Sequence, residues 1–163
     1  MDGLETVTPA GDDNRNKLAP NKPGLDRLVA DKLVADKLVM VIDDERTVLQ
    51  ALDLLLEMWG YRVVTAESEG EAVDRLSTAG ETPHVILADY RLREGRTGVQ
   101  AIDRIRAEAG AEVPGVIITG DTSTEGLRDA RARGLTVLQK PVLPPHLQAV
   151  LTKVLREQPA GTA

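Results

Sequence analysis

Leu38-Val-Met-Val-Ile-Asp-Asp-Glu45 is the stretch of sequence that decides the fold. It sets five apolar residues in a row directly before two carboxylates, Asp43 and Asp44. An apolar run without polar alternation is typical of a strand that is buried on both faces of its sheet. The stretch therefore predicts a central strand that ends in acidic residues.

The same pattern returns along the rest of the chain. Four more strands are expected at residues 61–66, 85–88, 116–118 and 135–138. Apolar residues at helical spacing predict helices over residues 48–59, 68–76, 99–105, 124–133 and 147–155. Ser68 and Glu71 form a capping-box signature at the start of the second helix. Alternating strands and helices with right-handed crossovers predict an α/β fold, a doubly wound five-stranded parallel sheet with five helices.

Length and composition limit the chain to one such domain. It has 163 residues, of which 42% are hydrophobic, so wholesale disorder is excluded. The longest apolar run, Leu38 to Ile42, is far shorter than the ~18 residues that span a bilayer. The absence of cysteine excludes disulfides and thiolate zinc sites. A net charge of −6 argues against direct nucleic-acid binding. We therefore expect a cytoplasmic domain that binds neither nucleic acid nor membrane.

The domain is expected to span residues 38–157. Residues 1–37 are interpreted as a disordered or partly helical tail or linker, since the stretch up to about Pro23 is polar and has no apolar period. The tail ends in a short tandem repeat, Leu28-Val-Ala-Asp-Lys32 and Leu33-Val-Ala-Asp-Lys37. Residues 158–163 are expected to form a flexible C-terminus.

Chemistry-bearing residues follow four of the five strands. Asp43 and Asp44 follow the first, Asp89 the third, Thr119 the fourth and Lys140 the fifth. Parallel strands bring such residues to one edge of the sheet. Three carboxylates in one pocket favour protonation or a bound cation, and ligands that are all oxygen suit Mg²⁺ or Mn²⁺. A carboxylate beside that ion can attack phosphorus and form an acyl phosphate.

Each of these residues has a simpler explanation when taken alone. Asp43 and Asp44 would cap the next helix, and Asp89 would be a turn residue. Thr119 would be a strand-end hydroxyl, and Lys140 a solvated cation whose stem covers apolar surface. Because all of them follow strands of one predicted sheet, a functional site is favoured instead.

Residues Leu38 to about Arg156 resemble a response-regulator receiver domain, the phosphoacceptor module of two-component signalling. The motifs that carry the resemblance are Val41-Ile-Asp-Asp-Glu45, Leu87-Ala-Asp-Tyr-Arg-Leu92, Val116-Ile-Ile-Thr-Gly120 and Lys140-Pro141. The resemblance implies the flavodoxin-like receiver fold. It also implies a regulatory domain and not an enzyme, which gains a phosphoryl group from a donor and loses it slowly.

The resemblance also implies a role for each residue of the site. Asp89 would be the phosphorylated aspartate, Thr119 the switch hydroxyl and Lys140 the lysine that pairs with the phosphate. The Lys140–Pro141 peptide bond would be cis. Receivers usually carry a Tyr or Phe three residues before this lysine, and this chain has Val137 there, so its conformational switch must work without that aromatic.

A magnesium site follows from the same resemblance. Asp44, Asp89 and the backbone carbonyl of Arg91 would bind Mg²⁺ (or Mn²⁺) directly, and Asp43 would act mainly through water. The residues two positions after the phosphoacceptor and after the switch hydroxyl are Arg91 and Asp121. We hypothesise that these two opposite charges pair across the mouth of the pocket and slow hydrolysis of the acyl phosphate; two independently solvated charges are the alternative.

The expected partner is a histidine kinase or a histidine phosphotransfer domain, whose phosphohistidine would supply the phosphoryl group. The chain is similar to receivers at the carboxyl end of hybrid sensor histidine kinases and to stand-alone receivers, and a weak homodimer is compatible with either. One alternative is a pseudo-receiver, an interaction module whose phosphorylation is not used. A haloacid-dehalogenase-type phosphatase uses the same residue types, but its nucleophile lies on the first strand, so the motif order excludes it.

Overall fold

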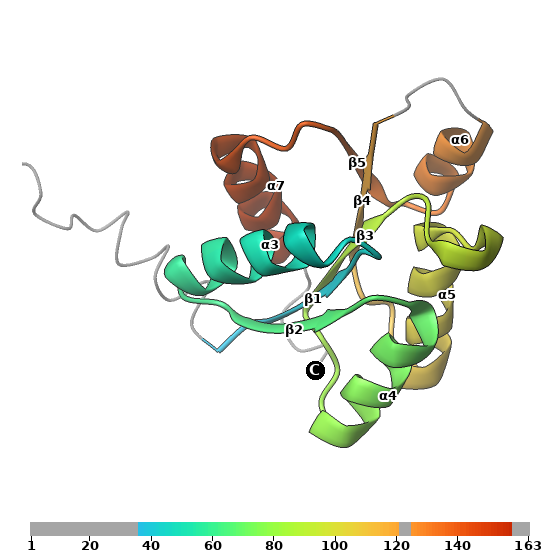
Figure 1. Cartoon of the computed structure of the whole chain (residues 1–163), viewed down its shortest axis with the longest axis horizontal. Coiled ribbons are helices and arrows are strands. Elements are labelled where there is room, and N and C mark those ends of the chain that lie inside the picture. The colour runs from blue at the N-terminus through green and yellow to red at the C-terminus, as the bar shows by residue number, and fades with distance from the viewer. Residues whose placement is uncertain (1–35, 121–124, 158–163) are drawn as a thin grey trace, which may run out of the picture. The chain divides into compact units, whose positions relative to one another are not determined.

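Five parallel strands form the sheet at the centre of this computed structural model, which describes residues 36–120 and 125–157. Their order across the sheet is β2-β1-β3-β4-β5, as Figure 1 shows. The strand bounds are β1 Leu38–Ile42, β2 Arg62–Ala66, β3 Val85–Asp89, β4 Gly115–Thr119 and β5 Thr136–Gln139. The first strand, β1, has β2 on one side, and β3, β4 and β5 follow in order on its other side. The topological switch point therefore lies between β1 and β3. The predicted doubly wound parallel sheet is confirmed.

Five α-helices and one short 3₁₀ turn connect and follow the strands in the described part of the chain. Their bounds are α3 Arg46–Met58, α4 Glu69–Ala79, η1 Arg93–Gly95, α5 Gly98–Ala109, α6 Glu125–Ala132 and α7 Pro144–Arg156. Ser68 caps α4 by accepting a hydrogen bond from the Glu71 amide at 3.1 Å, as its sequence signature predicts. Helix α7 begins earlier than expected, because Pro144 supplies the fixed φ that a first helical position favours.

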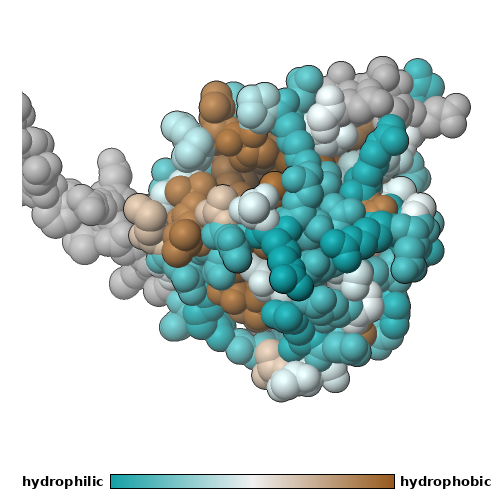
Figure 2. Space-filling view, viewed as in Figure 1, coloured by the Kyte–Doolittle hydropathy of each residue, from teal (hydrophilic) through white to brown (hydrophobic). Residues whose placement is uncertain are grey.

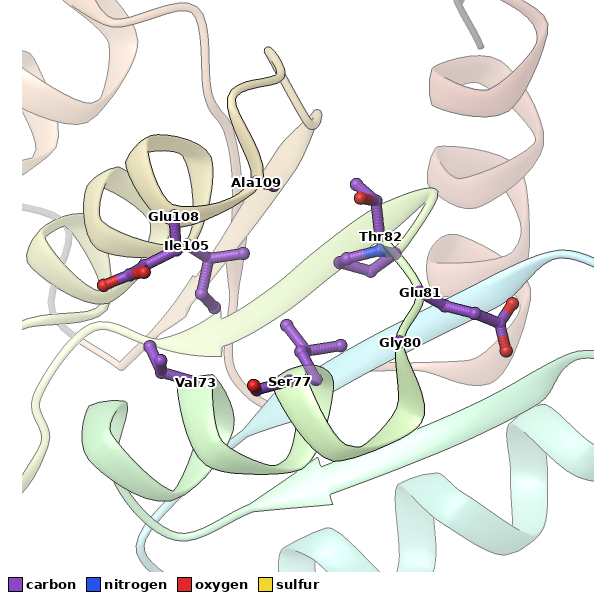
Figure 3. Close-up of a pocket in the computed structure, with 10 residues that line it drawn as sticks. Val73, Ser77, Gly80, Glu81, Thr82, Ile105, Glu108 and Ala109 are labelled. Carbon is purple, nitrogen blue, oxygen red and sulfur yellow. The ribbon is translucent and has the colours of Figure 1, made fainter.

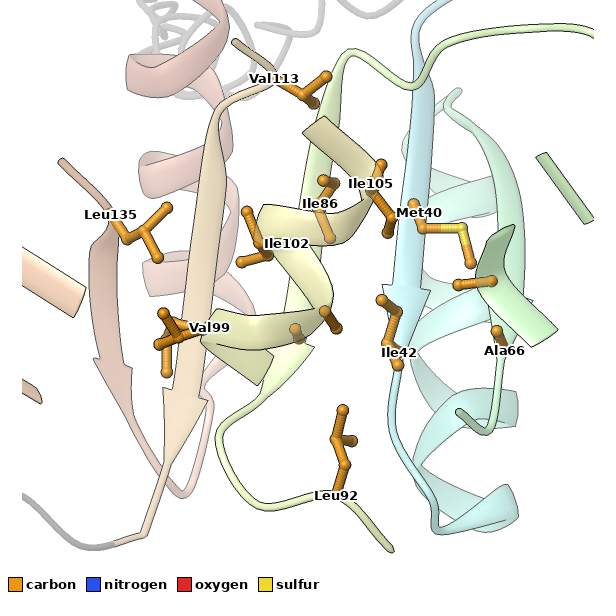
Figure 4. Close-up of a cluster of buried hydrophobic side chains, with 14 of the residues drawn as sticks. Met40, Ile42, Ala66, Ile86, Leu92, Val99, Ile102, Ile105, Val113 and Leu135 are labelled. Carbon is orange, nitrogen blue, oxygen red and sulfur yellow. The ribbon is translucent and has the colours of Figure 1, made fainter. Parts of the chain in front are cut away.

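Helices cover both faces of the sheet. On one face α4, α5 and α6 contribute buried residues such as Ala72, Ile102 and Ala130, and Figure 4 shows this cluster against Met40 and Ile86. On the other face α3 and α7 pack against alternate residues of the same strands. Every residue of β1 and of β4 is buried, which explains the apolar runs at residues 38–42 and 116–118.

The edge strands β2 and β5 are more exposed than the central three. Apolar residues gather over the α3 and α7 side in Figure 2. The exposed large apolar residues of the described part of the chain are Leu54 and Met58 of α3 and Leu143 before α7. No described helix combines the length and the apolar character that a membrane span needs. The expectations for residues 1–35, for Asp121 and for residues 158–163 lie outside the described residues.

Candidate functional site: an acidic pocket at the carboxyl edge of the sheet

Three carboxylates meet where β1 and β3 end. Asp43 and Asp44 follow β1 directly, and Asp89 is the last residue of β3. One oxygen from each of the three lies within 4.8 Å of the other two. The pairing of β1 with β3 brings these two strand ends together, as the parallel topology predicts.

Asp43 is the most buried of the three, with 3% of its surface exposed. Its Oδ1 accepts a hydrogen bond from the Glu45 amide at 2.9 Å, and its own amide donates to the Ala66 carbonyl at 3.1 Å. Burial, together with the nearby Asp89 and Asp44 carboxylates, raises the pKa of Asp43 from the ordinary 3.8 to about 6. The Glu45 amide and Lys140 oppose that rise. Asp43 therefore takes up a proton at a higher pH than an ordinary aspartate does.

Neither aspartate after β1 caps the next helix. The N-cap of α3 is Glu45, and it has no side-chain capping bond. Asp43 instead closes a local turn with the Glu45 amide, two residues ahead. The simpler explanation of Asp43 and Asp44 as helix caps is therefore wrong, and both carboxylates lie in the acidic cluster.

Lys140 lies beside Asp89, the aspartate at the end of β3. The Lys140 Nζ is 3.4 Å from the Asp89 Oδ1, and the Asp89 side chain is only 12% exposed. Burial raises the pKa of Asp89, while the charge and the hydrogen bond of Lys140 act to lower it. Asp89 thus lies near one ammonium and two other carboxylates, and the Lys140 ammonium is the group that can pair with negative charge added at Asp89.

Thr119 ends β4 next to Lys140. Its side chain is buried, with 2% of the residue exposed, and its carbonyl accepts a hydrogen bond from the Lys140 amide at 2.8 Å. The Lys140–Pro141 peptide bond is cis, as the sequence resemblance implies. The register of β4 with β5 continues to the pair Thr119 and Gln139, which brings Lys140 to the same edge.

The loop after β3 packs closely on the start of α5. A Cβ added to Gly98 would overlap the Asp89 carbonyl oxygen and come within 3.0 Å of the Ala88 Cβ. Thr97 and Gln100 form a reciprocal capping box in front of this glycine. The helix start therefore holds the backbone of Asp89 in place. The Thr97-x-x-Gln100 spacing is visible in the sequence and could have been used to find this cap.

Sequence reasoning missed an ion-pair group next to Asp44 of the acidic cluster. Glu67, after β2, accepts from Arg46 Nε at 2.9 Å and from Arg93 Nη2 at 3.4 Å. Arg93 also donates to the Asp44 carbonyl at 3.0 Å. Three loops are thereby joined around the acidic cluster. Charge spacing along the chain gives no signal for this group, because its members are 21 to 49 positions apart.

A second carboxylate, that of Glu69, forms an ion pair with Arg96 in the loop after β3. Glu69 begins α4, and only 8% of its surface is exposed. It accepts from Arg96 at 2.7 Å and from Arg104 of α5 at 3.2 Å. Arg91, in the same loop, is exposed and pairs by a backbone bridge with Thr97. The proposed metal contact of the Arg91 carbonyl stays a prediction.

The donor set of the acidic cluster fits a hard cation. Asp43, Asp44 and Asp89 offer only carboxylate oxygens, close enough together to share one ion. Such ligands suit Mg²⁺ or Mn²⁺, which keep waters and accept phosphate oxygens as further ligands. Burial is the largest cause of the raised pKa values of Asp43 and Asp89, and a neighbouring carboxylate raises each of them further.

A hollow of about 310 Å³ lies between α4 and α5, as Figure 3 shows. It is lined by Val73 and Ile105 from the two helices and by Thr82 and Pro83 from the segment before β3. Thr82 and Pro83 directly precede β3, whereas Asp89 ends it, so the hollow lies at the opposite edge of the sheet. We assign it no part in the chemistry of the acidic cluster.

The response regulator receiver domain family matches residues 39–152 of the chain. Among curated proteins, the phosphate regulon transcriptional regulatory protein PhoB of Pseudomonas aeruginosa is 31% identical over 133 residues, which cover 76% of this chain and 53% of that protein. The phyllosphere-induced regulator PhyR of Methylorubrum extorquens is 29% identical over 118 residues, which cover 72% of this chain and 43% of that protein. The chain thus spans about half the length of these relatives.

Solved structures show the same likeness. A response regulator receiver domain from Clostridium thermocellum has a TM-score of 0.66 at 26% identity, covering 74% of this chain and 94% of that one. The chemotaxis protein CheY4 of Vibrio cholerae has a TM-score of 0.66 at 28% identity, covering 74% and 99%. Both structural matches cover nearly the whole of the solved chain, so the similarity extends over an entire domain.

Proposed function

The chain belongs to the response regulator receiver domain family, and we propose that Asp89 is its phosphoacceptor, loaded from a phosphohistidine with the help of Mg²⁺. A receiver domain is a regulatory module of two-component signalling. One observation carries the proposal for this chain: the Asp89 carboxylate lies 3.4 Å from the Lys140 ammonium and within 4.8 Å of the oxygens of Asp43 and Asp44.

The chemical step is a phosphoryl transfer between two side chains. An Asp89 oxygen attacks the phosphorus of the phosphohistidine, and the new O–P bond forms as the P–N bond breaks. The P–N electron pair stays on the imidazole nitrogen, and a proton from solvent completes the neutral imidazole. Hydrolysis later returns the Asp89 carboxylate and inorganic phosphate.

Residues around Asp89 stabilise the charge of the transferred group. The Lys140 ammonium pairs with one phosphoryl oxygen, and the Thr119 hydroxyl donates to another. Asp44, Asp89 and the Arg91 carbonyl would hold Mg²⁺, and Asp43 would support it through water. When bound, the ion neutralises the carboxylates and the phosphoryl oxygens together.

The proposed partner is a histidine kinase or a histidine phosphotransfer domain, and the phosphorylated domain then controls a further protein. We propose a cytoplasmic location, since that is where phosphohistidine donors of this kind act. A pseudo-receiver would keep the fold and the interaction but would not use the phosphoryl group. The set of Asp43, Asp44, Asp89, Thr119 and Lys140 favours the phosphoacceptor.

Incubation of the full chain with a small acyl-phosphate donor and Mg²⁺ tests the proposal, with intact mass as the readout. We expect one phosphoryl group per chain, lost in Asp89→Asn and kept in the matched control Asp74→Asn, an exposed aspartate of α4. Steady turnover of phosphomonoesters would indicate a phosphatase. No adduct in the unmodified chain would indicate an interaction module. Either result contradicts the proposal.

A further inference from the structure

Tyr90 follows the proposed phosphoacceptor directly and packs against helix α6. A Cβ added to Gly126, in the first turn of α6, would overlap the Tyr90 hydroxyl and lie 2.8 Å from its Cε1. The tyrosine ring thus occupies the space that a side chain at position 126 would fill. Only glycine allows this direct contact between the ring and the helix backbone.

The backbone of Tyr90 is fixed to two neighbouring elements. Its amide donates to the Ile118 carbonyl of β4 at 2.9 Å, and its carbonyl accepts from the Gly98 amide of α5 at 2.8 Å. The residue therefore moves with the strand ends that carry Asp89 and Thr119. A tyrosine side chain has only two torsions, so its ring moves when its backbone moves.

Tyr90 lies on the same face of the sheet as Val137, the β5 residue at the position where receivers usually carry Tyr or Phe. The ring of Tyr90 and the side chain of Val137 pack against the same buried cluster. Helix α6 packs mainly on β5, and beyond its far end Arg133 pairs with Asp103 of α5. The first turn of α6 is thus the part of this helix that contacts the residue next to Asp89.

We propose that Tyr90 couples the chemical state of Asp89 to the position of helix α6, with Gly126 as its contact point. The inference rests on the proposed function, because it requires a group to be added at Asp89. A phosphoryl group there adds oxygens and negative charge one residue from Tyr90, and the strand end adjusts to hold them. The ring, already in contact with the α6 backbone, passes that adjustment to the helix.

Hydrogen–deuterium exchange of the full chain tests this coupling. Beryllium fluoride with Mg²⁺ replaces the phosphoryl group, and its binding is followed separately by calorimetry. In the unmodified chain we expect exchange to change in peptides that cover residues 125–132. In Tyr90→Ala we expect beryllium fluoride to bind still, while the change in α6 is lost. Val73→Ala is the matched control: it loosens the same cluster from α4, and the α6 response should remain.

A double-mutant cycle on the free energy of unfolding tests the contact itself. Gly126→Ala should destabilise the unmodified chain, because the new methyl overlaps the ring. In the Tyr90→Ala background the same change should stabilise, because alanine is the better helix former and the space is then empty. The sign should therefore reverse between the two backgrounds.

The two experiments separate the inference from the proposed function. If beryllium fluoride binds and Tyr90→Ala leaves the α6 response intact, or the unmodified chain shows no α6 response, the coupling is wrong and the phosphoacceptor stands. Equal effects of Gly126→Ala in both backgrounds would overturn the contact. If beryllium fluoride and phosphodonors both fail to load the chain, the proposed function and the coupling fall together.

Discussion

Asp43 and Asp44 are neighbours in sequence with different surroundings in the pocket. Asp43 is almost fully buried and accepts a backbone hydrogen bond, whereas Asp44 is partly exposed. We predict that Asp44→Ala weakens Mg²⁺ binding more than Asp43→Ala does, because Asp44 is the proposed direct ligand. The loss should be roughly tenfold or more, since even outer partners of a metal ligand contribute that much.

Isothermal titration of the full chain with Mg²⁺ measures these affinities. The control Asp74→Ala removes one exposed negative charge from α4 and should leave the affinity close to that of the unmodified chain. Equal Mg²⁺ affinities for Asp44→Ala and the unmodified chain would show that Asp44 is not a ligand.

His84 links stability to pH at the other end of the sheet. Its Nδ1 accepts a hydrogen bond from the Leu38 amide at 2.9 Å, which requires the neutral imidazole. Burial lowers the pKa of His84 below its ordinary 6.5, and Lys37 and Arg62 lower it further. Below pH 6.5 the unfolded chain gains a proton that the folded chain resists. The contribution of His84 to stability is therefore present above pH 6.5 and is lost as the pH falls through the lowered pKa.

Urea unfolding at a series of pH values checks this prediction. The difference in free energy of unfolding between the unmodified chain and His84→Gln should shrink as the pH falls below about 6.5. The substitution His146→Gln, at an exposed histidine of α7, is measured alongside as a control for the exchange itself. The prediction fails if the His84→Gln difference is the same at pH 5 and pH 7.5.

Helix α5 illustrates how an element positions the site. Gly98 is buried, and an added methyl would overlap the Asp89 carbonyl. We predict that Gly98→Ala lowers the free energy of unfolding by about 1–3 kcal/mol and reduces adduct formation on Asp89. Gly70 occupies the corresponding first turn of α4 with open space around it. Gly70→Ala should therefore stabilise by about 0.5–1 kcal/mol, and denaturant unfolding compares the two. A Gly98→Ala variant with the same free energy of unfolding as the unmodified chain would contradict the close approach of Gly98 to the Asp89 carbonyl.

The elements were largely predictable because their patterns are local. Leu38–Ile42 and Gly115–Thr119 are buried on both faces, and that burial explains the apolar runs at residues 38–42 and 116–118. Strand β5 was expected one residue early, since Leu135 is buried but precedes the paired residues. The positions of Asp89 and Thr119 followed from strand ends alone, because parallel strands share one carboxyl edge.

Contacts between loops were not predictable in the same way. Glu67 showed no chemical signal in the sequence, yet it pairs with Arg46 and Arg93. The contact of Tyr90 with Gly126 depends on how α6 lies on the sheet, and neither residue type indicates the other. Such pairings arise from tertiary packing, for which a single sequence holds no period or spacing.

At the scale of the whole molecule, the receiver domain should not depend on the first residues of the chain. Residues 1–23 have no apolar period that could add buried surface. We predict that their deletion leaves the melting temperature and the yield of phosphorylated chain unchanged. Calorimetry and intact mass on the full and shortened chains check this. A large drop in melting temperature would mean that these residues contribute to the fold.

Mapping the phosphoryl group after reaction with a P–N donor tests the central claim most directly. Phosphoramidate carries the same type of bond as phosphohistidine, and peptide fragmentation of the product locates the adduct. We predict one phosphoryl group on Asp89, formed with Mg²⁺, absent when a chelator removes the ion, and absent in Asp89→Asn. An adduct on any other residue, or an equal yield from Asp89→Asn, would contradict the assignment of Asp89 as the phosphoacceptor.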